Sequence, residues 1–193
     1  MIVVSVGCAT LQRGSNLQIN RGSNTMHQLY GEIPNGPVVL FYAGEPGYWM
    51  SNFSAFRVMY DDEDWMTSEH AYQAAKFTHI PLLYKAIRNA RSAHQALKLA
   101  RRSSESIRPD WTDKEKLRMM REIVRAKFDE HDYIQRKLKE TGKAWLIENS
   151  PKDSFWGRGP NHDGENHLGR LWMKIRDEHE RDLLEEFTNC GGD

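Results

Sequence analysis

Helical patterns follow one another through most of the chain, and they limit the fold more than any other feature of the sequence. The clearest begins at residue 112, where Thr112 and Glu115 form a capping box, a signal for the start of a helix. Hydrophobic residues then recur at helical spacing: Leu117, Met120, Val124 and Phe128. Helices are accordingly predicted over 82–90, 92–102, 112–130, 132–141 and 167–187.

Three short segments have the composition of β-strands. Residues 37–44 (PVVLFYAG) and 56–60 (FRVMY) are rich in β-branched and aromatic residues, and we expect them to pair in a small sheet. An acidic turn over 61–64 follows the second segment. Residues 143–148 (KAWLIE) predict a third strand, which leads into a turn-forming stretch over 149–166. The predicted fold class is α+β, mostly helical, with a small β-sheet beside a helical body in a single compact domain.

Composition divides the chain into three parts. Residues 10–36 are rich in Gly, Ser, Asn and Gln with little apolar periodicity, so 1–36 is predicted to be an arm or linker. The compact domain is predicted to span 37–187, and 188–193 to form a C-terminal tail.

Charge and cysteine content exclude some classes of protein. Lys and Arg total 27, as do Asp and Glu, so affinity for nucleic acid or an anionic membrane must be local. Cys8 and Cys190 lie near opposite ends, which is typical of a reducing compartment. The apolar start, MIVVSVGCA, is too short to span a bilayer and lacks a basic flank. We therefore expect no membrane partner and a cytoplasmic location, or a nuclear one in a eukaryote.

A polar stripe marks a helix predicted over 68–77 (SEHAYQAAKF). Glu69, Gln73 and Lys76 are separated by four and three residues, so they share one face. The other positions suit packing inside a domain: Ala71, Tyr72, Ala74 and Ala75. The stripe is either an ordinary solvated salt bridge or a site in which burial lowers the pKa of Lys76, so that it acts as a nucleophile while Glu69 moves protons.

The segment DSFWGRG (153–159) is a second candidate. Asp153 and Trp156 lie three residues apart, and Gly157 and Gly159 permit unusual backbone angles. An aromatic ring beside a carboxylate suits a site that stacks a flat heterocycle and performs acid or base chemistry. Alternatively, Trp156 fills the core and Asp153 caps a turn.

The segment GENHLGRLWMKIR (164–176) opens the last predicted helix. Asn166 is expected to cap it, and Gly169 to let another element approach its first turn. The spacing of the histidines and aspartate at 162, 163 and 167 matches no standard metal-ligand set, so no metal is predicted.

Residues 85–108 form a positive stretch with a single acid, Glu105. Its basic residues are Lys85, Arg88, Arg91, Lys98, Arg101, Arg102 and Arg108. This stretch is either a solvated helix face or a seat for the phosphates of a nucleotide or of a DNA backbone.

Several segments in this order resemble the NADAR family, also called YbiA-like: SNFSAF, TSEHAYQAAKF, DW, AKF, TG, IENSPKDSFWGRG and GENHLGRLWMKIR. The resemblance runs from about Phe41 to Arg176, and spaced motifs in one order are more specific than any single motif. It implies a compact, largely helical α+β domain. It also implies an N-glycosidase, associated with ADP-ribose and NAD-like ligands, that splits the bond between ribose C1 and an exocyclic nitrogen.

The resemblance also implies the residues of the site. The family's glutamate, lysine and aspartate fall on Glu69, Lys76 and Asp153, which are the expected catalytic residues. With the patterns above, the expected substrate-binding residues are Asn52, Phe53, Gln73, Arg101, Arg102, Trp111, Trp156, Gly157 and Asn166.

Two substrate classes are implied: guanine carrying ADP-ribose in DNA, which the positive stretch favours, and phosphoribosylamino-pyrimidine intermediates of riboflavin synthesis. No cofactor is expected. Lys76 is expected to form a Schiff base with the opened ribose while Glu69 and Asp153 move protons. Direct attack by water on an oxocarbenium-like sugar is the alternative route.

Two other classes of protein remain open. A binding module that recognises ADP-ribose without cleaving it would need the tryptophan and phosphate contacts but neither the acids nor the lysine. An interaction protein would use the polar stripe only as a salt bridge.

Overall fold

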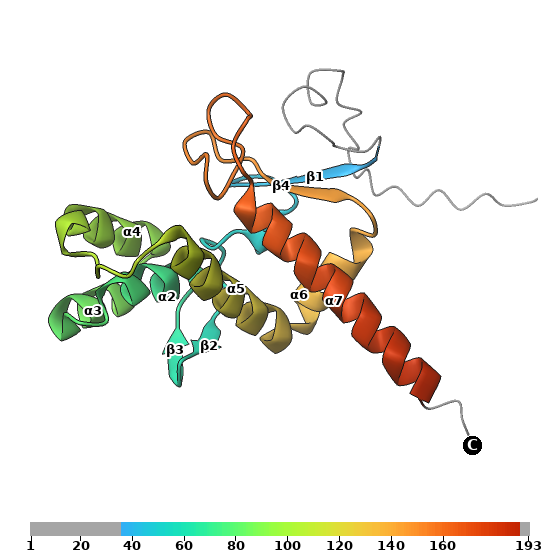
Figure 1. The fold of residues 1–193 in the computed structure, drawn as a ribbon, viewed down its shortest axis with the longest axis horizontal. Coiled ribbons are helices and arrows are strands. Elements are labelled where there is room, and N and C mark those ends of the chain that lie inside the picture. Colours follow the sequence, from blue (N-terminus) through green and yellow to red (C-terminus); the bar gives the residue numbers. More distant parts are fainter. Residues whose placement is uncertain (1–35, 190–193) are drawn as a thin grey trace, which may run out of the picture.

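The computed structural model describes residues 36–189 (Figure 1). The predicted arm, except for its last residue, and the end of the predicted tail lie outside the described residues, as do Cys8 and Cys190. The described part is an α+β fold that is mostly helical, as predicted.

The predicted helices are confirmed, with ends that shift by one or two residues. They are α2 (Ser68–Ala74), α3 (Pro81–Arg88), α4 (Ala93–Arg102), α5 (Asp113–Glu130), α6 (Asp132–Glu140) and α7 (His167–Asn189). A 3-10 turn, Ala75–Phe77, continues α2, and two others are Tyr48–Met50 and Ser104–Ser106. Thr67 caps α2 and Thr112 caps α5. The side chain of each accepts the backbone N–H of the residue three positions later.

The four strands form two separate pairs. Strand β1 (Val38–Phe41) is parallel to β4 (Trp145–Glu148), and β2 (Val58–Tyr60) is antiparallel to β3 (Glu63–Trp65). The prediction that 37–44 pairs with 56–60 is therefore wrong. The reason is local: β2 finds a partner through a tight turn before any distant strand is needed.

The predicted acidic turn over 61–64 is correct only in its first half. Asp61 and Asp62 form the turn with φ angles of 53° and 57°, the left-handed pattern of a type I′ hairpin, which aspartate tolerates. Glu63 and Asp64 already belong to β3.

Helix α5 lies at the centre of the fold. It packs against α2 on one side and against α6 and α7 on the other, and α2, α3 and α4 pack together (Figure 1). Strands and helices both contribute the largest side chains of the core, which are Phe41 of β1, Trp65 of β3, Phe77 of the 3-10 turn after α2, Phe128 of α5 and Trp172 of α7.

A charged side chain, Lys127 of α5, also lies in this core with 1% of its surface exposed. Its Nζ donates to the Trp49 carbonyl oxygen at 2.7 Å, the Ser51 carbonyl oxygen at 3.0 Å and Ser54 Oγ at 2.8 Å. These three acceptors match the three N–H groups of an ammonium ion. Burial nevertheless lowers the pKa of Lys127 to about 7. Lys127 thus fixes the segment 49–54 on α5.

We expect Lys127→Met to lower the free energy of unfolding by about 2–4 kcal/mol, because buried carbonyl oxygens lose their donor. Urea unfolding at pH 7 measures this change. The exposed Lys139 of α6 supplies the control, since Lys139→Met should stay within about 0.5 kcal/mol of the wild type. Equal losses in the two variants would show that Lys127 is not an anchor.

Candidate active site

The polar stripe of α2 is buried. Glu69 is 5% exposed and Gln73 4% exposed, because α2 lies between α4, α5 and the segment that carries Asn52. The stripe is therefore not a solvated helix face. Polar groups kept at such positions oppose stability and are frequent at functional sites.

Gln73 connects the two charged groups of the stripe. Lys76 Nζ donates to Gln73 Oε1 at 2.7 Å, and Gln73 Nε2 donates to Glu69 Oε1 at 2.8 Å. Within the described residues Glu69 and Lys76 form no direct ion pair. The alternative of a simple salt bridge is thus replaced by a relay through the amide of Gln73.

Burial changes the acidity of both charged groups. It raises the pKa of Glu69 to about 7 and lowers the pKa of Lys76 to about 8, although the charge of Glu69 opposes the second change. A fraction of Lys76 is therefore an unprotonated amine near neutral pH, which a lysine nucleophile requires.

Aromatic rings surround Lys76. Its Nζ lies 4.8 Å from the ring centroid of Tyr72 and 6.0 Å from that of Trp111. The Tyr72 ring contacts Trp111 at 5.4 Å and stands edge-on to Trp156 at 5.5 Å. Tyr72, predicted only as a packing residue, therefore forms a wall of the site. The sequence contained a signal for this role, because Tyr72 lies four residues before Lys76 and so on the same face of the helix.

The loop after β4 brings Asp153 to the same place. Asp153 Oδ1 accepts the backbone N–H groups of Phe155 at 3.0 Å and Trp156 at 2.8 Å, so it does cap a turn. Its charge also acts on the pKa values of Glu69 and Lys76. The structural and the functional interpretations of Asp153 are therefore compatible.

Glu148, the last residue of β4, was missed as a site residue. Burial, with the charges of Asp153 and Glu69, raises its pKa to about 8. Its Oε2 is buried and has no hydrogen-bond partner within the described residues. An acid at the carboxyl end of a predicted strand, just before the loop of Asp153, was a signal that could have found it.

Gly157 and Asn166 have structural contacts of their own. A Cβ at Gly157 would lie 2.7 Å from the Glu148 carbonyl oxygen. Asn166, expected to cap α7, instead donates from Nδ2 to the Leu146 carbonyl oxygen and accepts the Glu148 N–H at Oδ1, both at 2.9 Å. Its φ of 51° ends the loop and turns the side chain toward β4.

The close approach predicted at Gly169 is confirmed. A Cβ there would lie 2.1 Å from the Leu146 carbonyl oxygen, so β4 packs directly on the first turn of α7.

The predicted residues Asn52 and Phe53 lie beside the start of α2. The Asn52 carbonyl oxygen accepts the Glu69 N–H at 3.1 Å, and its buried Oδ1 has no partner among residues 36–189. Phe53 packs against His94 of α4 with ring centroids 4.9 Å apart.

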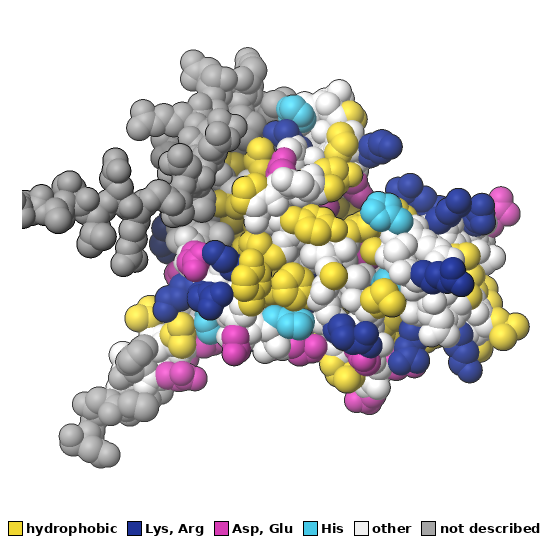
Figure 2. All heavy atoms as spheres, turned by 180° about the vertical axis from the view of Figure 1, so that it is seen from behind, with side chains coloured by type: hydrophobic (Ala, Val, Ile, Leu, Met, Phe, Trp, Pro, Cys, Tyr) yellow, Lys and Arg dark blue, Asp and Glu magenta, His cyan; other side chains and the backbone are white. Residues whose placement is uncertain are grey.

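The positive stretch divides into two groups. Arg88 pairs with Glu63, and Arg108 is held inside the fold. Arg101 and Arg102 are exposed at the end of α4. The charge of Arg101 acts on the pKa values of Glu69 and Lys76, whereas the side chain of Arg102 forms no hydrogen bond or ion pair with any residue of 36–189. Figure 2 shows Lys and Arg side chains over the end of the molecule that α3 and α4 form.

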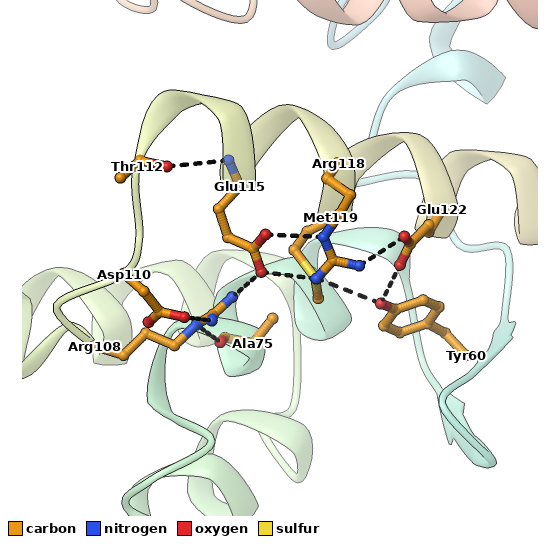
Figure 3. A network of polar contacts seen from close by, with 9 residues as sticks. All are labelled: Tyr60, Ala75, Arg108, Asp110, Thr112, Glu115, Arg118, Met119 and Glu122. Atoms are coloured by element: carbon orange, nitrogen blue, oxygen red, sulfur yellow. Dashed lines mark hydrogen bonds and ion pairs between the residues drawn. The ribbon is translucent and has the colours of Figure 1, made fainter.

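Arg108 holds the backbone around Lys76, and Figure 3 shows its side-chain contacts with Ala75, Asp110 and Glu115. Its Nε donates to the Ala75 carbonyl oxygen and its backbone N–H to the Lys76 carbonyl oxygen, both at 3.0 Å. Its guanidinium also pairs with Asp110 and with Glu115 of α5. Arg108, part of the predicted phosphate seat, is therefore a support for the segment that carries Lys76.

Residues 36–189 contain no group of three His, Cys, Asp or Glu side chains arranged to hold a metal ion. In the same part of the chain no helix is long and apolar enough to cross a membrane.

Comparisons with known proteins place this chain in a family. The NADAR domain model matches residues 40–179. An N-glycosidase of Nostoc punctiforme is 42% identical over 147 residues, which cover 72% of this chain and 91% of that protein. N-glycosidase YbiA of Escherichia coli is 34% identical over 142 residues, covering 73% of this chain and 88% of that protein.

The NMR structure of Escherichia coli YbiA has a TM-score of 0.69 to this chain at 34% identity, covering 77% of this chain and 88% of the other. A riboflavin biosynthesis protein of Vibrio vulnificus is 36% identical over 152 residues, which are 79% of this chain but 41% of that protein. The chain belongs to the NADAR family.

The acidity of Lys76 can be tested directly. We expect Lys76 to titrate near pH 8, below the ordinary 10.5 of a lysine, so that its unprotonated fraction grows as the pH rises through 8. Glu69→Gln should lower this pKa further, because it removes the negative charge that favours the ammonium form. NMR of ¹³C-methylated lysines measures both values, and Lys76→Arg identifies the resonance. A midpoint above pH 10 would contradict burial of the amine.

Proposed function

We propose that the chain is an N-glycosidase that hydrolyses the bond between ribose C1 and an exocyclic base nitrogen. The observation that carries this proposal is the hydrogen-bonded relay Glu69–Gln73–Lys76, with the charge of Asp153 acting on its two charged ends. Two relatives that match most of the chain are named as N-glycosidases, and this supports the same reaction class. A module that only binds its ligand would not need an amine and two acids grouped inside the fold.

In the proposed reaction the nitrogen lone pair opens the ribose ring, and the ring oxygen takes a proton. The resulting imine carbon is attacked by unprotonated Lys76, the base departs as a free amine, and a Schiff base with the sugar remains. Water then adds to that carbon and releases the sugar and Lys76. Glu69 and Asp153 move the protons, and Trp156 stacks on the heterocycle or ribose. Direct attack by water on an oxocarbenium-like sugar is the second route.

We further propose that the substrate is guanine carrying ADP-ribose in DNA. The site has positive charge on two sides. On one side Arg101 and its neighbours lie on α4. On the other, a groove between α5 and α7 is lined by Lys114, Arg118, Arg121, Arg125, Arg170 and Lys174, against the acids Glu122 and Asp129.

This basic groove leads away from the candidate site. His167, which lines it, has its ring 4.5 Å from Phe155 and 6.3 Å from Trp156. The three arginines of α5 form ion pairs, but Lys114, Arg170 and Lys174 form none within the described residues. Positive surfaces on both sides suit a chain of phosphates better than one phosphate.

The alternative substrate is a phosphoribosylamino-pyrimidine intermediate of riboflavin synthesis. A specific observation favours it, namely the similarity to the riboflavin biosynthesis protein of Vibrio vulnificus. This chain spans less than half of that protein. The name of that relative therefore supports a substrate for this chain less strongly than the names of the N-glycosidases support a reaction class.

Purified protein should release the base from at least one of these two substrates, as followed by mass spectrometry. We expect Lys76→Ala and Asp153→Ala each to lower kcat by at least about 100-fold, and Glu69→Gln to do the same, because each removes a proton-transfer group or the nucleophile. The control Lys139→Ala should match the wild type. Release of neither base would reject the enzyme class in favour of a binding module.

Borohydride added during turnover separates the two routes. We expect it to link the sugar to Lys76, because it reduces a Schiff base to a stable amine. Peptide mapping identifies the site, and Lys76→Arg is the control. If turnover is complete and no sugar becomes linked to the protein, Lys76 is not the nucleophile and acts only through its charge.

The nucleic-acid substrate can be distinguished by charge reversal in the basic groove. We expect Arg170→Glu with Lys174→Glu to lower kcat/KM on ADP-ribosylated DNA by about 10-fold or more at low salt and to flatten its salt dependence. On ADP-ribosylated guanosine the same variant should match the wild type. Equal effects on both substrates would argue against DNA in the groove.

A further inference from the structure

Three carboxyl groups from three segments lie near enough to one another at the candidate site for their charges to act on each other's pKa values. Glu69 comes from α2, Glu148 from the end of β4, and Asp153 from the loop that follows. The charges of Glu69 and Asp153 both act on Glu148. Like charges held together in a buried place do not all ionise, so at least one of these groups retains a proton.

Hydrogen bonds decide which of the three acids retains its proton. Asp153 Oδ1 accepts two backbone N–H groups, and Glu69 Oε1 accepts a hydrogen bond from the side-chain Nε2 of Gln73. Neither carboxyl oxygen of Glu148 accepts a hydrogen bond from any residue that the structure describes, and Oε2 is buried. Since donated hydrogen bonds favour the ionised form, Glu148 is the acid with the least support for a negative charge.

The backbone of Glu148 is held firmly. Its N–H donates to Asn166 Oδ1 and its carbonyl oxygen accepts the Arg158 N–H, both at 2.9 Å. Strand β4 is also paired with β1 in the register Phe41 to Glu148. The carboxyl group therefore extends from a fixed point, as an acid that acts in a defined direction requires.

We propose that Glu148 is the catalytic acid that delivers a proton to the departing base nitrogen. This inference rests on the proposed N-glycosidase reaction. The proton of the Glu148 carboxyl group moves to the nitrogen, and the electron pair of the C1–N bond leaves with it, so the base departs as a neutral amine. Water supplies the hydroxyl group of the released sugar, directly or through the Lys76 Schiff base. Its remaining proton returns through the carboxylates of Asp153 and Glu69 to Glu148, and no oxidant or reductant is needed.

The pKa of Glu148, about 8, agrees with this role, because the group then keeps its proton near neutral pH. The charges that act on it come from Asp153 and Glu69, while Lys76 and Arg101 act on Glu69. The nucleophile Lys76 and the acid Glu148 require opposite changes of pH. Activity should rise as Lys76 loses its proton and fall as Glu148 loses its own.

The decisive experiment is the pH profile of kcat on whichever substrate the wild-type protein cleaves. We expect a fall in activity above about pH 8 for the wild type. Glu148→Gln should lower kcat at pH 7 by at least about 100-fold and abolish the alkaline fall. Glu148→Asp, which keeps an acid, should be slower but retain the fall.

Binding of ADP-ribose, measured by calorimetry, shows whether the pocket of each variant is intact, and the Kd of Glu148→Gln should change by less than about threefold. If Glu148→Gln loses binding as well, the profile of Glu148→Asp decides. A Glu148→Gln enzyme within threefold of the wild type, or an unchanged alkaline fall in it, overturns the role of Glu148 while the proposed function stands. A wild-type protein that cleaves neither substrate overturns both.

Discussion

The geometry of the site depends on the buried ammonium group of Lys127, which binds three oxygens of the segment 49–54 and so holds that segment on α5. The carbonyl oxygen of Asn52, in the middle of the segment, accepts the N–H of Glu69, so the start of α2 rests on the same anchor. A buried ammonium is tolerated only when its N–H groups find acceptors. Here they do, and the rings of Phe56 and Trp172, 5.2 and 5.8 Å away, add attraction.

A second set of polar groups, at the candidate site, opposes the stability of the fold. Burial opposes the charged forms of Glu69 and Lys76, and a hydrophobic stripe would pack in α2 without that opposition. Gln73 makes the arrangement workable, because its amide donates to the acid and accepts from the amine. Arg108 then fixes the backbone of Lys76 from outside. Stability lost at the stripe is a common accompaniment of function.

The parallel pair of β1 and β4 explains how distant segments meet. The loop after β1 leads to Asn52, and the loop after β4 leads to Asp153, so both loops start from the same edge of the pair. A contact between Glu45 and Asn149 joins them. Ligands in folds with parallel strands often bind beyond the carboxyl ends of the strands, and the acids of this site lie there. The small sheet thus positions Glu148 and Asp153 at the candidate site, while the helices supply most of the core.

The sequence by itself determined the local structure. Helix positions, the cap at Thr112, the three predicted strands and the shared face of Glu69, Gln73 and Lys76 all follow from spacing and capping chemistry within a few residues. The segment DSFWGRG and the family resemblance together added Asp153 and Trp156, whose roles stay predictions. Strand pairing, the anchor Lys127 and the acid Glu148 were decided only by the tertiary structure. A buried lysine has the same local pattern as an exposed one, and the environment of a carboxyl group is made by side chains far along the chain, so burial and its effect on pKa exist only once the chain has folded.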